Sequence, residues 1–320
     1  MPPFAVVEGA AILEAAAHTI GLPLTALRIA QPSETLAVFD EQLPVLEIGT
    51  TDLPYTPGIP STAGAKLALR SLDTAVRLAQ RGSASAVVTS PINKAELAAV
   101  GFAHPGQTEF VAERFGVAAE DAVMMLAGPT LRTVPLTVHC ALAEVPGLIT
   151  AELLQRRIRI AAHALSQDFG IARPRIAVAA LNPHAGEGGR FGTEDNRIIA
   201  PAIAALREEG LDVTGPHPAD ALFTPRARVR FDLAVCMYHD QALIPLKALD
   251  FDEGVNVTLG LPVVRTSPDH GTAFDIAGRG VADPGAMAAA IRMAGECASR
   301  RQQNPKTAQP VLVEGRQLSQ

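Results

Sequence analysis

The chain has 320 residues, of which 48% are hydrophobic and 19% are charged, and its formal net charge is −6. This composition is that of a globular protein with enough chain for two domains. The acidic balance, the 4% aromatic content and the lack of a Lys/Arg block argue against a nucleic-acid partner. The start has no basic segment and no run of about 18 apolar residues occurs, so we expect neither a signal peptide nor a membrane span.

Short apolar runs rich in β-branched residues alternate along the chain with Ala- and Leu-rich stretches. This alternation predicts an α/β fold with a largely parallel sheet. The predicted helices are residues 10–20, 63–81, 109–115, 151–169, 197–209 and 285–300, and Ser61 or Thr62 is the expected N-cap of the second. The predicted strands are residues 85–89, 122–126, 134–138, 175–181, 233–237 and 255–259.

Three of the eight histidines, His139, His184 and His239, come at the ends of predicted strands. Ligands of open α/β sheets bind just beyond the carboxyl ends of the strands. Three imidazoles that converge there suit a divalent catalytic metal with an open position. The competing interpretation is that each histidine has a surface or structural role, because spacing in the sequence does not show convergence.

A glycine-rich turn, residues 182–192, surrounds His184. It suits the approach of an anion to the backbone, although a tight loop without a ligand is an equal alternative, and it matches neither GxGxxG nor a P-loop. Farther along, Lys247, Asn256 and Arg265 combine two cations with an amide. Such a set suits a substrate that carries phosphate and carboxylate, whereas the alternative is a solvated surface. Residues from 267 onward predict a further helix, capped by Asp269 or Thr272.

Seven blocks of the sequence together resemble the signature of the 4-hydroxythreonine-4-phosphate dehydrogenase family. They are residues 89–94, 104–110, 182–189, 218–220, 237–241, 254–262 and 265–273. The resemblance extends over about residues 1–300 and implies an isocitrate/isopropylmalate-dehydrogenase-like fold, with two α/β/α lobes around a central cleft. Residues 1–110 plus 272–320 would form the first lobe, and residues 111–271 the second, which would carry the metal histidines and the dimer interface.

The same resemblance implies a chemistry. The family oxidises 4-phosphohydroxy-L-threonine with NAD or NADP to 2-amino-3-oxo-4-phosphooxybutanoate, which decarboxylates to 3-amino-2-oxopropyl phosphate in pyridoxine 5′-phosphate biosynthesis. It implies a homodimer with the active site at the subunit interface. The three cysteines, which are not in CxxC spacing, independently favour a reducing cytoplasm. The implied metal ligands are His139, His184 and His239, and the implied substrate contacts are Gln107, Thr108, Lys247, Asn256 and Arg265.

The general base and the metal ion each have more than one candidate. Asp240 and Asp269 are rival candidates for the general base, and Asp240 would alternatively orient His239. Nitrogen ligands favour Zn²⁺ as the metal, with Mg²⁺ or Co²⁺ as alternatives.

The sequence departs from the family pattern at two places. Gln107 stands where the family has a histidine, and an amide forms hydrogen bonds but does not carry a proton as His⁺ does. The family's opening strand and its Gly-Asp-Pro-x-Gly-Ile-Gly-Pro-Glu segment are missing, so we expect a misassigned start or a truncated form. Three rival functions follow: a dehydrogenase of threonate or erythronate 4-phosphate or of a cis-dihydrodiol carboxylate, a metal-dependent hydrolase or aldolase, and an inactive dimer partner.

Overall fold

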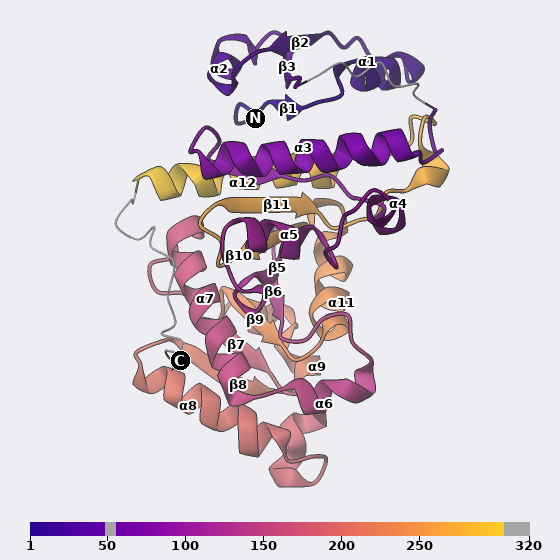
Figure 1. The fold of residues 1–320 in the computed structure, drawn as a ribbon. Helices are drawn as coiled ribbons and strands as arrows, with labels where there is room; N and C mark the ends of the chain where they lie inside the picture. The colour runs from indigo at the N-terminus through magenta and orange to yellow at the C-terminus, as the bar shows by residue number, and fades with distance from the viewer. Residues whose placement is uncertain (49–55, 304–320) are drawn as a thin grey trace, which may run out of the picture. The chain divides into compact units, whose positions relative to one another are not determined.

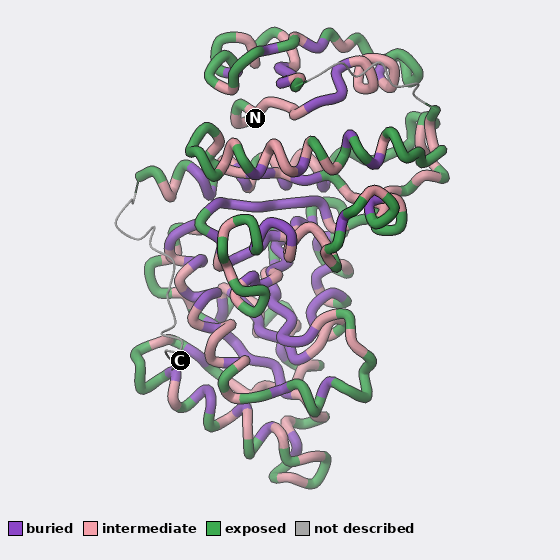
Figure 2. The backbone as a smooth tube through the Cα atoms, in the orientation of Figure 1, coloured by how far each residue is buried: buried purple, intermediate pink, exposed green. Residues whose placement is uncertain are grey.

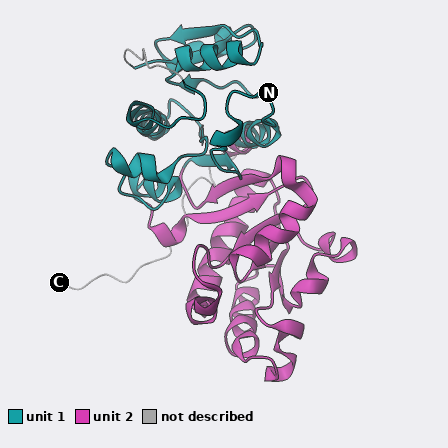
Figure 3. Ribbon diagram, turned by 90° about the vertical axis from the view of Figure 1, so that its right-hand side faces the viewer, with its two compact units in different colours: residues 1–116, 263–296 teal, residues 117–262, 297–320 magenta. Residues whose placement is uncertain are grey.

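The computed structural model describes residues 1–48 and 56–303, which divide into two compact units (Figure 3). Unit 1 comprises Met1–Gly116 and Val263–Glu296, and unit 2 comprises Val117–Pro262 and the residues from Cys297. The lobes expected from the sequence break at residues 110 and 271 instead, and they keep the C-terminal helix in the first lobe. Among the described residues, no helix combines the length and the apolar character needed to cross a membrane.

Unit 2 is built on strands in the order β10-β5-β6-β9-β7-β8 (Figure 1). Their bounds are β5 Val123–Ala127, β6 Arg132–Pro135, β7 Ile176–Ala179, β8 Val213–His217, β9 Leu233–Cys236 and β10 Val255–Leu259. Pairing is parallel from β6 through β9 and β7 to β8, whereas β5 runs antiparallel to β6 and to β10. β7 and β9 are buried along their whole length, as expected of parallel strands with both faces covered (Figure 2).

Helices on both faces bury these strands (Figure 1). α7 (Ala151–Phe169) begins after Thr150, whose Oγ1 accepts a hydrogen bond from the Leu153 amide at 3.1 Å, and it ends at a left-handed Gly170. Its buried Leu154, Ile158 and Leu165 recur at helical spacing. α11 (His239–Asp250) packs on β6 and β9. The other helices of unit 2 are α6 (Val145–Leu148), α8 (Ala200–Glu208), α9 (Ala219–Leu222) and α10 (Pro225–Arg228).

Unit 1 contains a small parallel sheet of order β1-β3-β2 and the parallel pair β4 and β11. The strands are β1 Val6–Val7, β2 Ala26–Ile29, β3 Leu43–Leu46, β4 Ala86–Val88 and β11 Val264–Pro268. The helices are α1 Ala10–Thr19, α2 Thr35–Val38, α3 Thr62–Gln80, α4 Lys94–Ala99 and α5 Gln107–Arg114, and α12 Gly285–Gln303 begins in this unit. Ser61 caps α3, as predicted, because its Oγ accepts a hydrogen bond from the Gly64 amide at 3.1 Å.

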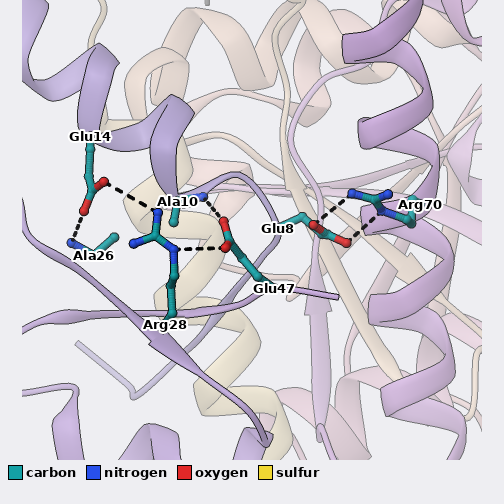
Figure 4. Close-up of polar contacts among 7 residues, drawn as sticks. All are labelled: Glu8, Ala10, Glu14, Ala26, Arg28, Glu47 and Arg70. Atoms are coloured by element: carbon teal, nitrogen blue, oxygen red, sulfur yellow. Dashed lines mark hydrogen bonds and ion pairs between the residues drawn. The ribbon is translucent and has the colours of Figure 1, made fainter. Parts of the chain in front are cut away.

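Carboxylates tie the small sheet of unit 1 to its helices (Figure 4). Glu47 accepts a hydrogen bond from the Ala10 amide at 3.1 Å and another from Arg28 Nε at 3.0 Å, so it connects the first turn of α1 to β2. Glu8 is 4% exposed and pairs with Arg70 of α3, with 2.8 Å between Nε and Oε1. A negative charge at the start of α1 also interacts favourably with the helix dipole.

The predicted helices and strands all occur, with bounds that shift by a few residues. The sequence patterns gave no bounds for β1, β2, β3, β8, β11 and α11, nor for the short helices α2, α4, α6, α9 and α10. The helix expected after residue 267 is wrong: β11 continues to Pro268, and only a short 3₁₀ turn, Phe274–Ile276, follows. Ala273, the residue before this turn, has a φ of 46°, a left-handed conformation that does not continue an α-helix.

Candidate active site

The three histidines follow strands that are neighbours in the sheet of unit 2. His139 comes after β6, His239 is the first residue of α11 after β9, and His184 lies in the turn after β7. β6 and β9 are parallel partners, as are β9 and β7, so their carboxyl ends lie at the same edge of the sheet. The sequence argument from strand ends is therefore confirmed for the positions of these residues in the sheet.

His139 and His239 face each other across the ends of β6 and β9. Their ring centroids are 5.8 Å apart. Zinc–nitrogen bonds of about 2.0–2.1 Å in tetrahedral geometry place two imidazoles at a similar separation, on the order of 5 Å. Asp240 Oδ1 lies 2.7 Å from His239 Nδ1. This contact favours the tautomer with the proton on Nδ1, and it leaves Nε2 with its lone pair available to a metal.

His184 lies in a left-handed stretch of backbone. From His184 to Gly189 every φ is positive, with values between 41° and 100°. Left-handed conformation costs an L-residue roughly 1–2 kcal/mol, and this stretch includes the non-glycine residues His184, Ala185 and Glu187. His139 is also left-handed, at φ 51°. Two of the three expected metal ligands are thus held in strained backbone, which is typical of functional sites.

The three imidazoles are suitable ligands for a divalent metal, and the structure brings two of them together. His139 and His184 are exposed and His239 is half-buried, so all three rings are accessible. Within residues 1–48 and 56–303, no group of three or more His, Cys, Asp or Glu side chains stands in a metal-binding arrangement. His139 and His239 are adjacent, while the ring of His184 lies 6.2 Å from the ring of Phe191.

Arg265 of β11 is the centre of a polar cluster in unit 1. Its side chain is buried, with 4% of the residue exposed. It donates to Thr89 Oγ1 at 2.8 Å, to Gln107 Oε1 at 3.2 Å and to Thr108 Oγ1 at 3.4 Å, all neutral oxygens. Burial lowers the pKa of Arg265 to about 10, against the opposing effect of the Glu109 carboxylate. A desolvated cation at the start of α5 is suited to an anionic group.

Gln107 and Thr108 are the first residues of α5, where the helix amides have no intrahelical acceptors. The Gln107 amide nitrogen also donates to the Ser90 carbonyl at 3.3 Å, so this side chain connects the loop after β4 to Arg265. The structure therefore brings three of the predicted substrate residues together: Gln107, Thr108 and Arg265.

Lys247 and Asn256 belong to unit 2. Lys247 is half-buried and lies on α11, a helix that the sequence patterns did not predict. Asn256 lies on β10, next to the antiparallel β5. Its Oδ1 is buried and accepts no hydrogen bond from the described residues. A buried oxygen without a donor is costly, so this atom is suited to a ligand or a water molecule.

The structure also describes Asp269, two further histidines and the cysteines. Asp269 follows β11 and is half-buried, and the His270 ring contacts the neighbouring Gly271 carbonyl at 3.0 Å. His104 packs against Phe102 and Phe110, in agreement with a structural role. Cys236 and Cys297 are buried, and Cys140 is half-buried.

Sequence reasoning missed the residues that support the site. Thr89, Thr137 and Gln241 bond to site residues or to the strand ends that carry them. Asp195, fully buried, accepts hydrogen bonds from the Leu181 and Asn182 amides at 2.8 and 3.1 Å. Only the position of Thr89 and Gln241 inside the family blocks signalled them, because hydrogen bonds to distant backbone leave no periodic pattern.

Comparison with known proteins identifies relatives of this chain. The family model described as "Pyridoxal phosphate biosynthetic protein PdxA" matches residues 2–294. The 4-hydroxythreonine-4-phosphate dehydrogenase of Erythrobacter litoralis is 62% identical over 94% of this chain and 89% of its own. The crystal structure of the enzyme of that name from Klebsiella pneumoniae superposes with a TM-score of 0.81 at 38% identity, covering 91% of this chain and 88% of its own.

A second activity occurs among the structural neighbours. The terephthalate 1,2-cis-dihydrodiol dehydrogenase of Burkholderia xenovorans has a TM-score of 0.61 at 31% identity, covering 90% of this chain and 93% of its own. The predicted α/β class and the predicted resemblance are both confirmed by these matches. The chain belongs to the family of pyridoxal phosphate biosynthetic proteins PdxA.

Proposed function

We propose that this chain is a nicotinamide-linked dehydrogenase that oxidises 4-phosphohydroxy-L-threonine at C3. The overall reaction gives 2-amino-3-oxo-4-phosphooxybutanoate, which loses CO2 to give 3-amino-2-oxopropyl phosphate, a step of pyridoxine 5′-phosphate synthesis. The observation that carries the proposal is the pair His139 and His239 at the ends of adjacent parallel strands, in a chain 62% identical to a relative named for this activity.

His139, His184 and His239 are the residues that would hold a divalent metal, for which Zn²⁺ is the first candidate and Mg²⁺ or Co²⁺ are alternatives. Bound there, the metal would supply Lewis acidity that lowers the pKa of the substrate hydroxyl. Asp240 orients the His239 ring through Nδ1. Asp240 and Asp269 remain the two candidates to accept the hydroxyl proton.

Arg265, with Thr108 and Gln107, is proposed to bind an anionic group of the substrate. The buried guanidinium offers several N–H donors in one plane, which match phosphate or carboxylate oxygens. Lys247 would contribute a second cation, and the Asn256 amide would contact a polar substrate group through its unsatisfied oxygen. Gln107 binds but does not transfer protons, because an amide does not titrate. NAD or NADP is the proposed oxidant.

We further propose a cytoplasmic homodimer in which the active site lies at the subunit interface. On α11 and the turn that follows it, Ile244 and Phe251 are 66% and 72% exposed, and Ala248 between them is also exposed. The spacing of these residues puts them on one helix face, and burial of such an apolar face against a second copy is favourable. Sedimentation velocity tests this: wild type is expected to sediment as a dimer, and Phe251→Asp as a monomer.

The alternative function is a dehydrogenase of a related acid: threonate 4-phosphate, erythronate 4-phosphate or a cis-dihydrodiol carboxylate. The structural neighbour that acts on a terephthalate cis-dihydrodiol favours it. Gln107 gives it a second argument, since this residue touches Arg265 and differs from the family's histidine.

The deciding experiment follows NAD(P)H absorbance with each candidate substrate, before and after treatment with a chelator. Metal-dependent turnover of 4-phosphohydroxy-L-threonine with the highest kcat/KM is expected. Faster turnover of a dihydrodiol carboxylate would replace the proposal by its alternative. Folded, metal-loaded protein that reduces neither NAD nor NADP with any of these acids would contradict both.

A further inference from the structure

The strand ends that carry the three histidines are tied to one another by side chains. Thr137, two residues before His139, donates its hydroxyl to the Met237 carbonyl at 2.9 Å. Met237 is two residues before His239. The Thr137 amide donates to the same carbonyl at 3.3 Å, so the hydroxyl, in a residue that is 6% exposed, reinforces the last backbone contact between the ends of β6 and β9.

Gln241 makes the corresponding tie between the ends of β9 and β7. Its Oε1 accepts a hydrogen bond from the Met237 amide at 2.6 Å, and its Nε2 donates to the Ala180 carbonyl at 2.8 Å. Ala180 is four residues before His184. The first bond is of the kind that caps a helix, because Gln241 is in the first turn of α11. The second bond reaches another strand and is not needed to cap the helix.

Asp195 holds the remaining loop. Its carboxylate is fully buried and accepts hydrogen bonds from the Leu181 amide, the Asn182 amide and the Asn182 side chain, at 2.8, 3.1 and 2.9 Å. It begins a π-helical turn, Asp195–Ile199, a feature that is frequent at functional sites. The chain between Ala180 and His184 is thus fixed on one side by Gln241 and on the other by Asp195.

We propose that Thr137 and Gln241 are positioning residues that hold the loops of His139, His184 and His239 at the spacing required by one metal ion. The proposal rests on the metal site of the proposed function and adds the residues that determine its geometry. Two of the three loops adopt left-handed backbone at the histidine, so their conformation needs support from neighbouring structure. Side chains that hydrogen-bond directly to metal ligands change metal affinity by roughly 10–100-fold in other proteins. Thr137 and Gln241 act through the backbone next to the ligands, so we expect effects at the lower end of this range.

Thr133 provides a matched control for Thr137. Both are buried threonines of the same stretch of chain, and each donates its hydroxyl to a backbone carbonyl: Thr133 to Ala242 at 3.2 Å, within α11, and Thr137 to Met237. Thr133→Val and Thr137→Val each remove one hydroxyl at nearly constant volume. If both hydroxyls act only on stability, the two variants change the unfolding temperature and the Co²⁺ affinity alike. If Thr137 positions the histidine loops, only Thr137→Val changes the Co²⁺ affinity.

The test titrates metal-free protein with Co²⁺ and follows its visible absorption, with thermal unfolding of each metal-free variant measured in parallel. Thr137→Val is expected to weaken Co²⁺ binding by ~10-fold or more and to alter the absorption bands, whereas Thr133→Val keeps the wild-type affinity and bands. Gln241→Glu retains the acceptor for the Met237 amide, loses the donor to the Ala180 carbonyl, and is expected to weaken binding by a similar factor.

The outcomes separate this proposal from the metal site itself. Equal Co²⁺ affinity in wild type, Thr137→Val and Gln241→Glu overturns the positioning role, while His184→Ala still loses binding. Wild-type protein whose Co²⁺ binding is unaffected by His184→Ala removes the metal site and the positioning role together. If Thr137→Val does not fold, Gln241→Glu decides, because an unchanged affinity in that variant alone overturns the tie between β9 and β7.

Discussion

The histidine loops of unit 2 and the Arg265 cluster of unit 1, the two proposed ligand sites, are supported in opposite ways. The histidines are exposed or half-buried, and two of them, His139 and His184, have strained backbone. Their support comes from buried hydrogen bonds to the backbone beneath them. Arg265 is itself buried in a strand, and its support comes from side chains that bond to it directly. Neutral imidazoles bind a metal when they have the correct spacing, and their burial matters little. A cation that binds an anion attracts it more strongly when water is excluded, because the local dielectric constant is lower.

The largest effect is expected from removal of a proposed metal ligand, His184. His184→Ala should reduce metal-dependent turnover by at least ~10²-fold, because electrostatic stabilisation of the developing alkoxide depends on the metal. Metal content, measured by atomic absorption after dialysis, should fall in parallel. His163→Ala, on α7 in the same unit, is the matched control and should keep both values. Full activity of His184→Ala without bound metal would contradict the role of the histidine loops.

The next effect concerns the buried cation. Arg265→Met should raise the KM for the phosphorylated substrate by roughly 10²-fold, since the loss of one partner of a buried charge pair costs about 2–5 kcal/mol. The fold should survive, because an apolar residue of similar length avoids the burial of a charge. Arg159→Met, which removes an exposed pair with Glu209, should leave the KM unchanged. An equal KM in the two variants would exclude Arg265 from substrate binding.

The pH dependence of substrate binding sharpens this comparison. Because burial lowers the pKa of Arg265 to about 10, the KM should be constant below that pH and rise above it as the guanidinium loses its charge. The unfolded chain keeps the proton to a higher pH, because its guanidinium is fully solvated and has the ordinary pKa of arginine. Between these two values the unfolded state binds more protons, so the contribution of Arg265 to the free energy of unfolding increases with pH.

The KM profile is measured from about pH 8 to 10.5 in wild type and in Arg265→Met. The variant has no group to titrate at this position, so its profile should be flat over the range in which the wild-type KM rises. Parallel profiles in the two proteins would assign the rise to another group.

The two regions also differ in how far the sequence predicted them. His139, His184 and His239 were found by strand-end reasoning, because buried strands give long apolar runs and the next polar residue marks the sheet edge. Arg265 was found as a cation, but its burial was not predicted, since nothing in a single sequence shows which distant oxygens surround a guanidinium. The supporting residues Thr137, Gln241 and Asp195 were missed for the same reason. α11 was missed because its first turn is polar and Pro245 interrupts its helical pattern.

The smallest effect separates backbone strain from ligand function in the histidine loops. Ala185, next to His184, has a φ of 53°, which glycine adopts without a steric penalty. Ala185→Gly should therefore stabilise the protein by up to about 1 kcal/mol, because relief of the left-handed strain exceeds the added entropy of the unfolded chain. The free energy of unfolding, measured in urea, checks the sign.

Ala204→Gly is the matched control, since Ala204 is an exposed residue inside α8 and glycine there should destabilise by roughly 0.5–1 kcal/mol. Opposite signs for the same chemical change would show that the turn around His184 is held in a costly conformation by the rest of unit 2. If Ala185→Gly also weakens Co²⁺ binding, the alanine side chain limits the turn to conformations that place His184 for the metal. If both variants destabilise equally, the turn is not strained, and the histidine loops do not depend on a costly backbone conformation.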